Sequence, residues 1–220
     1  MKIKYTLKQV YPNIYLCTIK DMYDLTMTFC RVQEFYESPF NQIRGKKFKL
    51  VDYMRLYSKK NGSFTYSIDW MGFNIPGPII AKLYNLGIDD YTCYDKIIED
   101  IHKKINKEVK TRDNYYLIGA NDNKTTVQHE LCHGLYFINK QYKKDVDKIL
   151  KKIIPSLRKK VELALSNLGY CKAVMNDEIQ AYFSTESQTI KELSHFTKKE
   201  LINFTDITLE LKANFKKYKK

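Results

Sequence analysis

The chain lacks the features of a disulfide-rich or membrane-spanning protein. Its 220 residues include only five cysteines, an odd number without any Cys-x-x-Cys pair, so neither a disulfide framework nor a thiolate zinc site is expected. No run approaches the roughly eighteen apolar residues that a transmembrane helix needs. Lys2 and Lys4 are not followed by the apolar segment of a secretory signal. We therefore expect a protein of a reducing compartment, the cytoplasm, without a membrane partner.

Arginine is also scarce. The 38 basic residues comprise 33 Lys and 5 Arg, against 25 acidic residues, and give a formal net charge of +13. Such an excess attracts acidic partners, including nucleic acids. However, the arginine fork is the side chain that usually reads phosphates and base edges. A weak association with an acidic partner or nucleic acid is one interpretation of the charge, and a biased composition rich in Lys, Ile, Asn and Tyr is the other.

Internal repeats and low-complexity linkers are absent from the sequence. With 44% hydrophobic residues, 18 Tyr and 11 Phe, the chain can bury a substantial core. We expect one domain over residues 1–220, with a mixed strand and helix part at 1–112 and a helical part at 113–220 that carries the candidate site.

The first part has weak periodicity. Alternating patterns predict strands over Tyr11 to Ile19 and over Leu25 to Val32, although the second segment could continue into a helix through Gln33 to Glu37. Helical spacing predicts helices over Phe48 to Tyr57, from Pro76 to about Gly87 and over Asp95 to Lys107. His102 lies among lysines on the last of these helices, and we expect it at the surface.

The second part has clearer signals. The apolar run Tyr115 to Ala120 predicts a strand, and a polar turn follows it. Thr125 and Gln128 have the spacing of a capping box, which predicts a helix that starts there. Further helices are expected up to Pro155 and at about 156–168, 173–186 and 197–217. The lysines before Pro155 are interpreted as the solvated side of a helix.

The most informative segment is His129-Glu-Leu-Cys-His133, which matches the His-Glu-x-x-His motif of zinc-dependent hydrolases. A random chain with 4 His and 11 Glu would contain this pattern roughly 0.004 times. On a helix, residues four apart share a face, so both imidazoles can reach one Zn²⁺. Glu130 would then be placed as a general base.

Two imidazoles alone hold zinc weakly, so a third protein ligand is expected. Glu178 is the first candidate because its helical neighbours at i±3 and i±4 are apolar: Val174, Met175, Ala181 and Tyr182. Asp177 and Glu186 are the second and third candidates.

These residues resemble a known family. A His-Glu-x-x-His motif followed by a glutamate on a later helix is the pattern of the gluzincin metallopeptidases, and Glu178-Ile-Gln-Ala-Tyr-Phe183 looks like the Glu-x-x-Ala-x-x-Phe variant of ImmA/IrrE-type members. The resemblance covers roughly residues 115–186. It implies an α+β, zincin-like fold, with His129, His133 and Glu178 as ligands of one Zn²⁺ and Glu130 as general base.

The family pattern also has a gap here. Thermolysin-like gluzincins have an Asp four residues after the third ligand, where it orients a zinc histidine, whereas this chain has Tyr182. The carboxylate that would orient a histidine is therefore unassigned. More loosely, the two motifs resemble uncharacterised phage and large-virus proteins, which would imply a host cytoplasm.

The sequence thus predicts a zinc-dependent hydrolase that acts on a peptide or protein. In its expected fold, a small N-terminal strand-containing part packs against a mainly helical C-terminal half. Tyr136, Tyr182 and His195 are the candidates for stabilising an oxyanion, and the sequence does not choose among them. The alternative is a protein of the same fold that binds metal, an acidic partner or a polyanion without catalysis.

Overall fold

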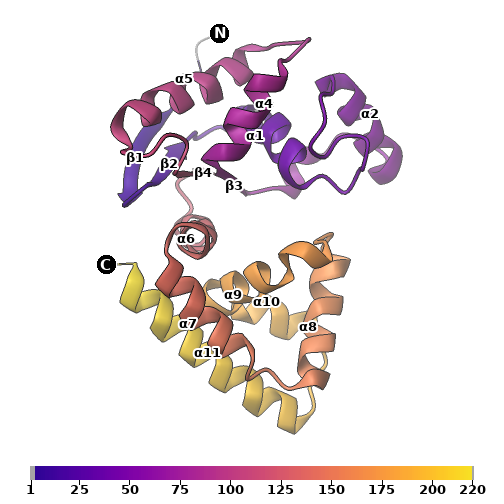
Figure 1. Ribbon diagram of the computed structural model, residues 1–220. Helices are drawn as coiled ribbons and strands as arrows, with labels where there is room; N and C mark the ends of the chain where they lie inside the picture. Colours follow the sequence, from indigo (N-terminus) through magenta and orange to yellow (C-terminus); the bar gives the residue numbers. More distant parts are fainter. Residues whose placement is uncertain (1–2, 220) are drawn as a thin grey trace. The chain divides into compact units, whose positions relative to one another are not determined.

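The structure is a computed structural model that describes residues 3–219, and it is a mixed α+β protein, as the sequence predicted (Figure 1). The chain forms two compact units, unit 1 at Met1–Val127 and unit 2 at Gln128–Lys220. The boundary falls within α6 (Lys124–Ile138). The strand predicted over Tyr115 to Ala120, which was expected in the helical second part, belongs to the sheet of unit 1. The organisation as one domain stays a prediction.

Unit 1 contains a four-stranded sheet with the order β1-β2-β4-β3. The strands β1 (Thr6–Tyr11) and β2 (Ile14–Thr18) form an antiparallel pair, and β2 pairs in parallel with β4 (Tyr116–Ala120). The edge strand β3 (Gly72–Pro76) runs antiparallel to β4. All five residues of β4 are buried, which explains its continuous apolar sequence.

Of the two strands expected in unit 1, the first was confirmed in part and the second was wrong. The segment predicted as a strand from Tyr11 to Ile19 contains β2, but it also includes the last residue of β1 and a hairpin turn at Asn13, whose φ of 62° is in the left-handed region. The segment predicted as a strand from Leu25 lies within the helix α1 (Met22–Glu37). Asp21 caps this helix, since its side chain accepts a hydrogen bond from the backbone N–H of Asp24 at 2.8 Å.

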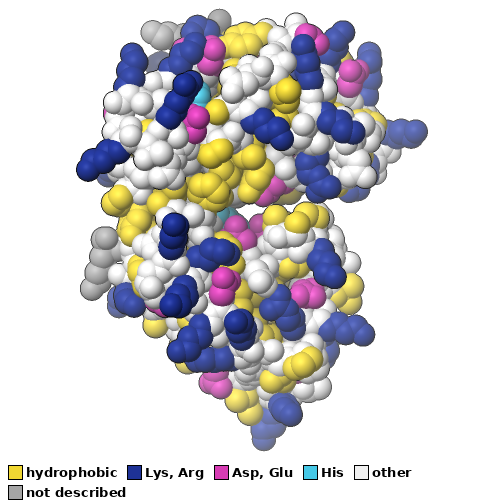
Figure 2. All heavy atoms as spheres, in the orientation of Figure 1, with side chains coloured by type: hydrophobic (Ala, Val, Ile, Leu, Met, Phe, Trp, Pro, Cys, Tyr) yellow, Lys and Arg dark blue, Asp and Glu magenta, His cyan; other side chains and the backbone are white. Residues whose placement is uncertain are grey.

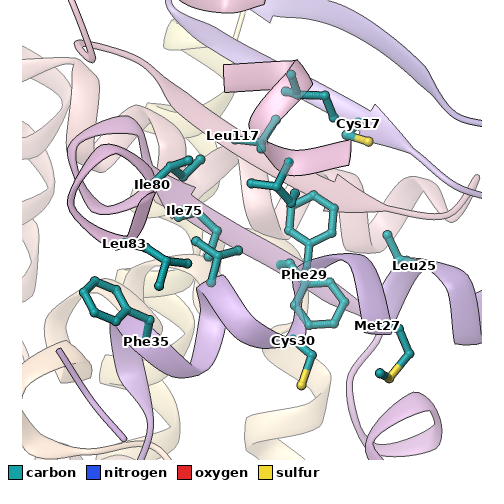
Figure 3. Close-up of a cluster of buried hydrophobic side chains, with 14 of the residues drawn as sticks. Cys17, Leu25, Met27, Phe29, Cys30, Phe35, Ile75, Ile80, Leu83 and Leu117 are labelled. Carbon is teal, nitrogen blue, oxygen red and sulfur yellow. The ribbon is translucent and has the colours of Figure 1, made fainter. Parts of the chain in front are cut away.

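The core of unit 1 lies between α1 and the sheet (Figure 3). The Phe29 ring on α1 stacks on Phe73 of β3 with 5.3 Å between ring centroids. A Cβ atom at Gly119 of β4 would lie 2.4 Å from the Phe29 ring. Because this distance is far below van der Waals contact, glycine at position 119 is what lets α1 pack this closely on the sheet.

The helices α2 (Leu50–Asn61), α4 (Gly77–Leu86) and α5 (Cys93–Glu108) match the predicted helices within a few residues. The short α3 (Tyr66–Asp69) was not predicted. The expectation that His102 of α5 lies at the surface was wrong. Its side chain is buried, and its Nδ1 lies 2.7 Å from the hydroxyl of Tyr115.

Unit 2 is helical throughout its described elements. Its helices after α6 are α7 (Lys140–Leu150), α8 (Pro155–Asn167), the 3₁₀ turn η1 (Lys172–Val174), α9 (Met175–Thr185), α10 (Ser187–Glu192) and α11 (Lys198–Tyr218). The helix α9 contacts α7, α8, α10 and α11. Because α9 packs against these four helices, the positions of its side chains are fixed. Among the described residues, no helix has the length and apolar character to cross a lipid bilayer.

Candidate metal centre

The helix α6 presents both motif histidines. It begins at Lys124, one residue before the predicted start, and the side chain of Asn123 accepts hydrogen bonds from the backbone N–H groups of Thr125 and Thr126 at 2.9 and 3.2 Å. The cap is therefore Asn123 and not Thr125. One turn separates His129 from His133, and their ring centroids are 4.9 Å apart. Both side chains are buried.

Glu178 of α9 completes a three-residue cluster with these histidines. One carboxylate oxygen lies 3.8 Å from Nε2 of His129, and the other lies 3.8 Å from Nε2 of His133. One potential ligand atom from each residue lies within 4.8 Å of the others, and all three residues are buried. The group His129, His133 and Glu178 could hold a metal ion.

Two observations fit this cluster to a divalent metal. Four ligands placed about 2.1 Å from a tetrahedral ion are about 3.4 Å apart, so the 3.8 Å spacings require only a small closure. In addition, the Oε2 atom of Glu178 is buried without a hydrogen-bond partner among the described residues. A buried carboxylate oxygen in this state is destabilising unless a ligand satisfies it. Imidazole and carboxylate donors together suit a transition metal.

Two further carboxylates face the other ring nitrogens. Asp177 Oδ1 lies 2.9 Å from Nδ1 of His133, and Glu186 Oε1 lies 3.0 Å from Nδ1 of His129. Each Nδ1–H can therefore be donated to a carboxylate, which leaves Nε2 to face Glu178. The sequence ranked Asp177 and Glu186 only as alternative ligands. Their positions instead suit the orienting role that the family pattern left unassigned.

The carboxylates dominate the electrostatics of the cluster. Burial alone would lower the pKa of His129, but the nearby carboxylates of Glu178 and Glu186 outweigh it and raise this pKa to about 9. Burial likewise disfavours the charged form of His133, yet the charges of Asp177 and Glu178 raise its pKa well above the ordinary value. The hydrogen bond from His129 lowers the pKa of Glu186. The two imidazoles thus lie among four carboxylates, those of Glu130, Asp177, Glu178 and Glu186, and this excess of acidic groups favours a bound cation.

Glu130 is buried on α6 between the two histidines. Its negative charge helps to raise the pKa values of His129 and His133, and it acts in the same direction on the phenols of Tyr170 and Tyr182. The carboxylate of Glu130 is therefore electrostatically coupled to the whole cluster, although it is not one of the three grouped residues.

Two tyrosines lie beside the cluster. The ring of Tyr182 meets the ring of His129 edge-on at 4.8 Å, and its hydroxyl lies 3.2 Å from that of Tyr170. Burial raises the pKa of Tyr182 to about 12. The phenol therefore keeps its proton at neutral pH and can donate a hydrogen bond. Tyr170 belongs to no motif of the sequence and comes directly after Gly169, which has a φ of 103°.

The other two candidates for oxyanion stabilisation lie elsewhere. The hydroxyl of Tyr136 donates a 2.6 Å hydrogen bond to Asp147 of α7. The side chain of His195 is exposed between α10 and α11, and its backbone carbonyl accepts a hydrogen bond from Lys160. Of the three candidates, Tyr182 is therefore the one that the structure places beside His129.

Cys132, inside the motif, is buried in the same helix, and burial raises the pKa of its thiol. Cys132 is therefore a small packed side chain of the helix. All five cysteines are free in the structure.

Comparison with known proteins gives no relative from which to assign this centre. No family model, curated protein sequence or solved structure matches the chain. The geometry of the cluster therefore carries the functional argument alone.

Proposed function

We propose that the chain is a zinc metallopeptidase with a zincin-like fold, in which His129, His133 and Glu178 hold Zn²⁺ and Glu130 is the general base. The observation that carries the proposal is the buried Glu178 carboxylate, 3.8 Å from Nε2 of each motif histidine on another helix. Two histidines and one carboxylate are the ligand set of catalytic zinc in several peptidases. Structural zinc sites are typically closed by four protein ligands, often cysteines, so a set of three favours catalysis.

Bound zinc would supply a lowered pKa for water and polarisation of a substrate carbonyl. The protein residues divide the remaining tasks. Asp177 and Glu186 hold the imidazoles in one orientation through Nδ1. Glu130 accepts a proton from the attacking water and returns it to the leaving nitrogen, so that its carboxylate is regenerated. Tyr182 donates its phenolic hydrogen to the oxygen that gains negative charge.

A peptide bond is the proposed target because the motif that places a carboxylate next to the first histidine is the one that metalloproteases use. The proposed location is the cytoplasm. The competing proposal is a protein of the same fold that binds metal and a partner without turnover, and it differs in the expected activity alone.

The test combines metal analysis with an activity assay. Protein purified without added metal or chelator should contain about one zinc per chain by elemental analysis, and removal of zinc should lower the melting temperature. Cleavage of a broad peptide library and of an unfolded protein should require the metal and return when zinc is added back. Absence of a stoichiometric transition metal would refute the proposal, whereas a zinc-loaded protein that cleaves nothing would favour the non-catalytic alternative.

A further inference from the structure

The helix α7 carries a row of lysines along its solvent face. The row consists of Lys140, Lys144 and Lys148 of α7 and the C-cap residue Lys151, spaced by four, four and three residues. At 100° per residue these positions fall within a sector of about 80° on the helix. All four side chains are exposed. The opposite face of α7 is buried through Tyr142, Val146, Ile149 and Leu150, so the helix is anchored and the row is fixed on the surface.

This lysine row has no acidic partner among the residues that the structure describes. The two acids of α7 are engaged elsewhere: Asp145 accepts from the Tyr218 hydroxyl at 2.7 Å and Asp147 from the Tyr136 hydroxyl at 2.6 Å. By contrast, several lysines outside the row form ion pairs, such as Lys152 with Glu210 and Lys160 with Glu200. Figure 2 shows basic side chains gathered over the region of unit 2 where Figure 1 places α7.

Lys148, in the last turn of α7, complements the helix dipole, but the N-terminal part of the row does not serve the stability of its own helix. Lys140 lies at the start of α7, where the helix dipole disfavours positive charge, and the first turn contains no acid. The pairs Lys140 with Lys144 and Lys144 with Lys148 place like charges one turn apart, which is unfavourable. Solubility does not require lysines alone, because an exposed helix face with both acidic and basic residues is equally soluble. The arrangement therefore fits an external polyanion better than an internal role.

The spacing of the row matches a regular chain of phosphates. From Lys140 to Lys151 the helix rises about 16 Å, and one nucleic acid strand has a phosphate about every 3.4 Å along its axis. The row thus spans about five successive phosphates of one strand, and its four lysines can each contact one of them. A lipid surface is less suitable, because no large hydrophobic residue is exposed between positions 140 and 151 of the described chain.

We propose that the lysine row Lys140, Lys144, Lys148 and Lys151 binds the phosphate backbone of a nucleic acid without reading its sequence. Lysines act as point charges and not as forks for base edges, which agrees with an interaction that depends on charge and spacing. This proposal does not rest on the metallopeptidase function, since none of the four residues belongs to the metal cluster.

The experiment measures binding of fluorescent single-stranded and double-stranded 20-mers of two unrelated sequences, at salt concentrations from 50 to 200 mM. The test variant replaces the four lysines of the row by Gln. The matched control replaces four exposed lysines of unit 1 that are dispersed over its surface: Lys46, Lys59, Lys104 and Lys110. Both variants lose the same net charge. Zinc content and peptide cleavage are followed in parallel, and neither variant should change them.

The row variant should weaken binding at 50 mM salt by at least about 10-fold and reduce the salt slope by up to about 2.8 on single strands, while the control changes Kd by less than about 3-fold. Equal losses in both variants would show that net charge alone binds, and this would overturn the proposal. Preference for one sequence, or tight binding only to vesicles with 30% anionic lipid, would also overturn it. Since removal of like charges should not destabilise α7, the row variant is expected to fold. The single charge reversals Lys144→Glu and Lys148→Glu provide a second test. Each should reduce the slope of log K against log salt concentration by at least about 1.

Discussion

The carboxylate of Glu186 lies 3.0 Å from Nδ1 of His129, the ring nitrogen that faces away from Glu178. This contact joins the end of α9 to the motif helix and decides which nitrogen of His129 remains for a metal. Asp177 has the same relationship to His133 at 2.9 Å. The two histidines are thus each held between a carboxylate at Nδ1 and Glu178 at Nε2.

Loss of these orienting carboxylates should weaken metal binding without abolishing it. We expect Glu186→Ala and Asp177→Ala to raise the Kd for zinc by about 10- to 100-fold. Glu186→Gln should recover part of the loss, because its amide oxygen can still accept from Nδ1–H. The measurement is a zinc titration against a chelator of known affinity, with Glu192→Gln, at an exposed position of α10, as control. An unchanged Kd in both alanine variants would remove the orienting role.

Substitution of a proposed zinc ligand should remove more zinc than substitution of an orienting carboxylate. Glu178→Ala and His133→Ala should each lose most of the zinc after extensive dialysis, since two ligands hold the ion weakly. Asp177→Ala and Glu186→Ala should retain most of it under the same conditions. Elemental analysis of all four variants, with circular dichroism to verify folding, makes the comparison. If Glu178→Ala retained zinc and Asp177→Ala lost it, Asp177 would be the ligand and Glu178 the orienting carboxylate.

Substitution of Glu130 distinguishes an enzyme from a protein that only binds metal. Glu130→Gln preserves the shape of the side chain and removes the proton acceptor, so zinc content and melting temperature should stay near the wild-type values. Peptide hydrolysis should fall by about 10²- to 10⁴-fold, mostly in kcat. Steady-state kinetics on the best library peptide give this number. A variant that keeps the wild-type rate would refute Glu130 as the base.

Local sequence signals predicted much of the metal centre. The motif placed His129 and His133 on one helix, and the apolar neighbours of Glu178 marked it as a carboxylate that needs a partner; the structure brings these three together. The roles of Asp177 and Glu186 were not predictable in this way. Spacing along a helix does not tell which ring nitrogen a carboxylate on another helix will face.

The missed parts of the fold have physical causes too. The helix α1 was predicted in part as a strand because residues from Leu25 to Phe35 are all buried, so no polar face produces a helical period. Its start was still visible in Asp21, a favourable capping residue. Tyr170 gave no sequence signal at all, since a turn at Gly169 brings it to Tyr182.

Tyr182 should contribute to the chemical step and not to metal binding. Its hydroxyl is a protonated donor beside His129, with a pKa raised to about 12 by burial. Tyr182→Phe keeps the ring contact and removes the donor, so kcat should fall by about 10²- to 10³-fold with zinc content unchanged. Tyr136→Phe, which removes a hydroxyl bound to Asp147, is the matched control. Equal kcat values for the two variants would contradict a special role for Tyr182.

His102 makes the stability of unit 1 dependent on pH. The imidazole is buried, its Nδ1 lies near the Tyr115 hydroxyl, and Asn106 lies 3.2 Å from its Nε2. Burial lowers the pKa of His102 below its ordinary value of 6.5, although the nearby charge of Asp113 opposes this. The folded chain therefore binds the proton less readily than the unfolded chain.

The sign of the pH effect follows from this difference. The stability contribution of neutral His102 is complete above the unfolded pKa near 6.5 and decreases as the pH falls, until the folded pKa is passed. The loss amounts to about 1.4 kcal/mol for each unit between the folded and unfolded pKa values. Denaturant unfolding at pH 7.5 and pH 5 should show a smaller pH difference for His102→Gln than for the wild type, even though the variant is less stable at pH 7.5. Because all other titrating groups are common to both proteins, an equal pH difference would show that His102 does not change its protonation on unfolding.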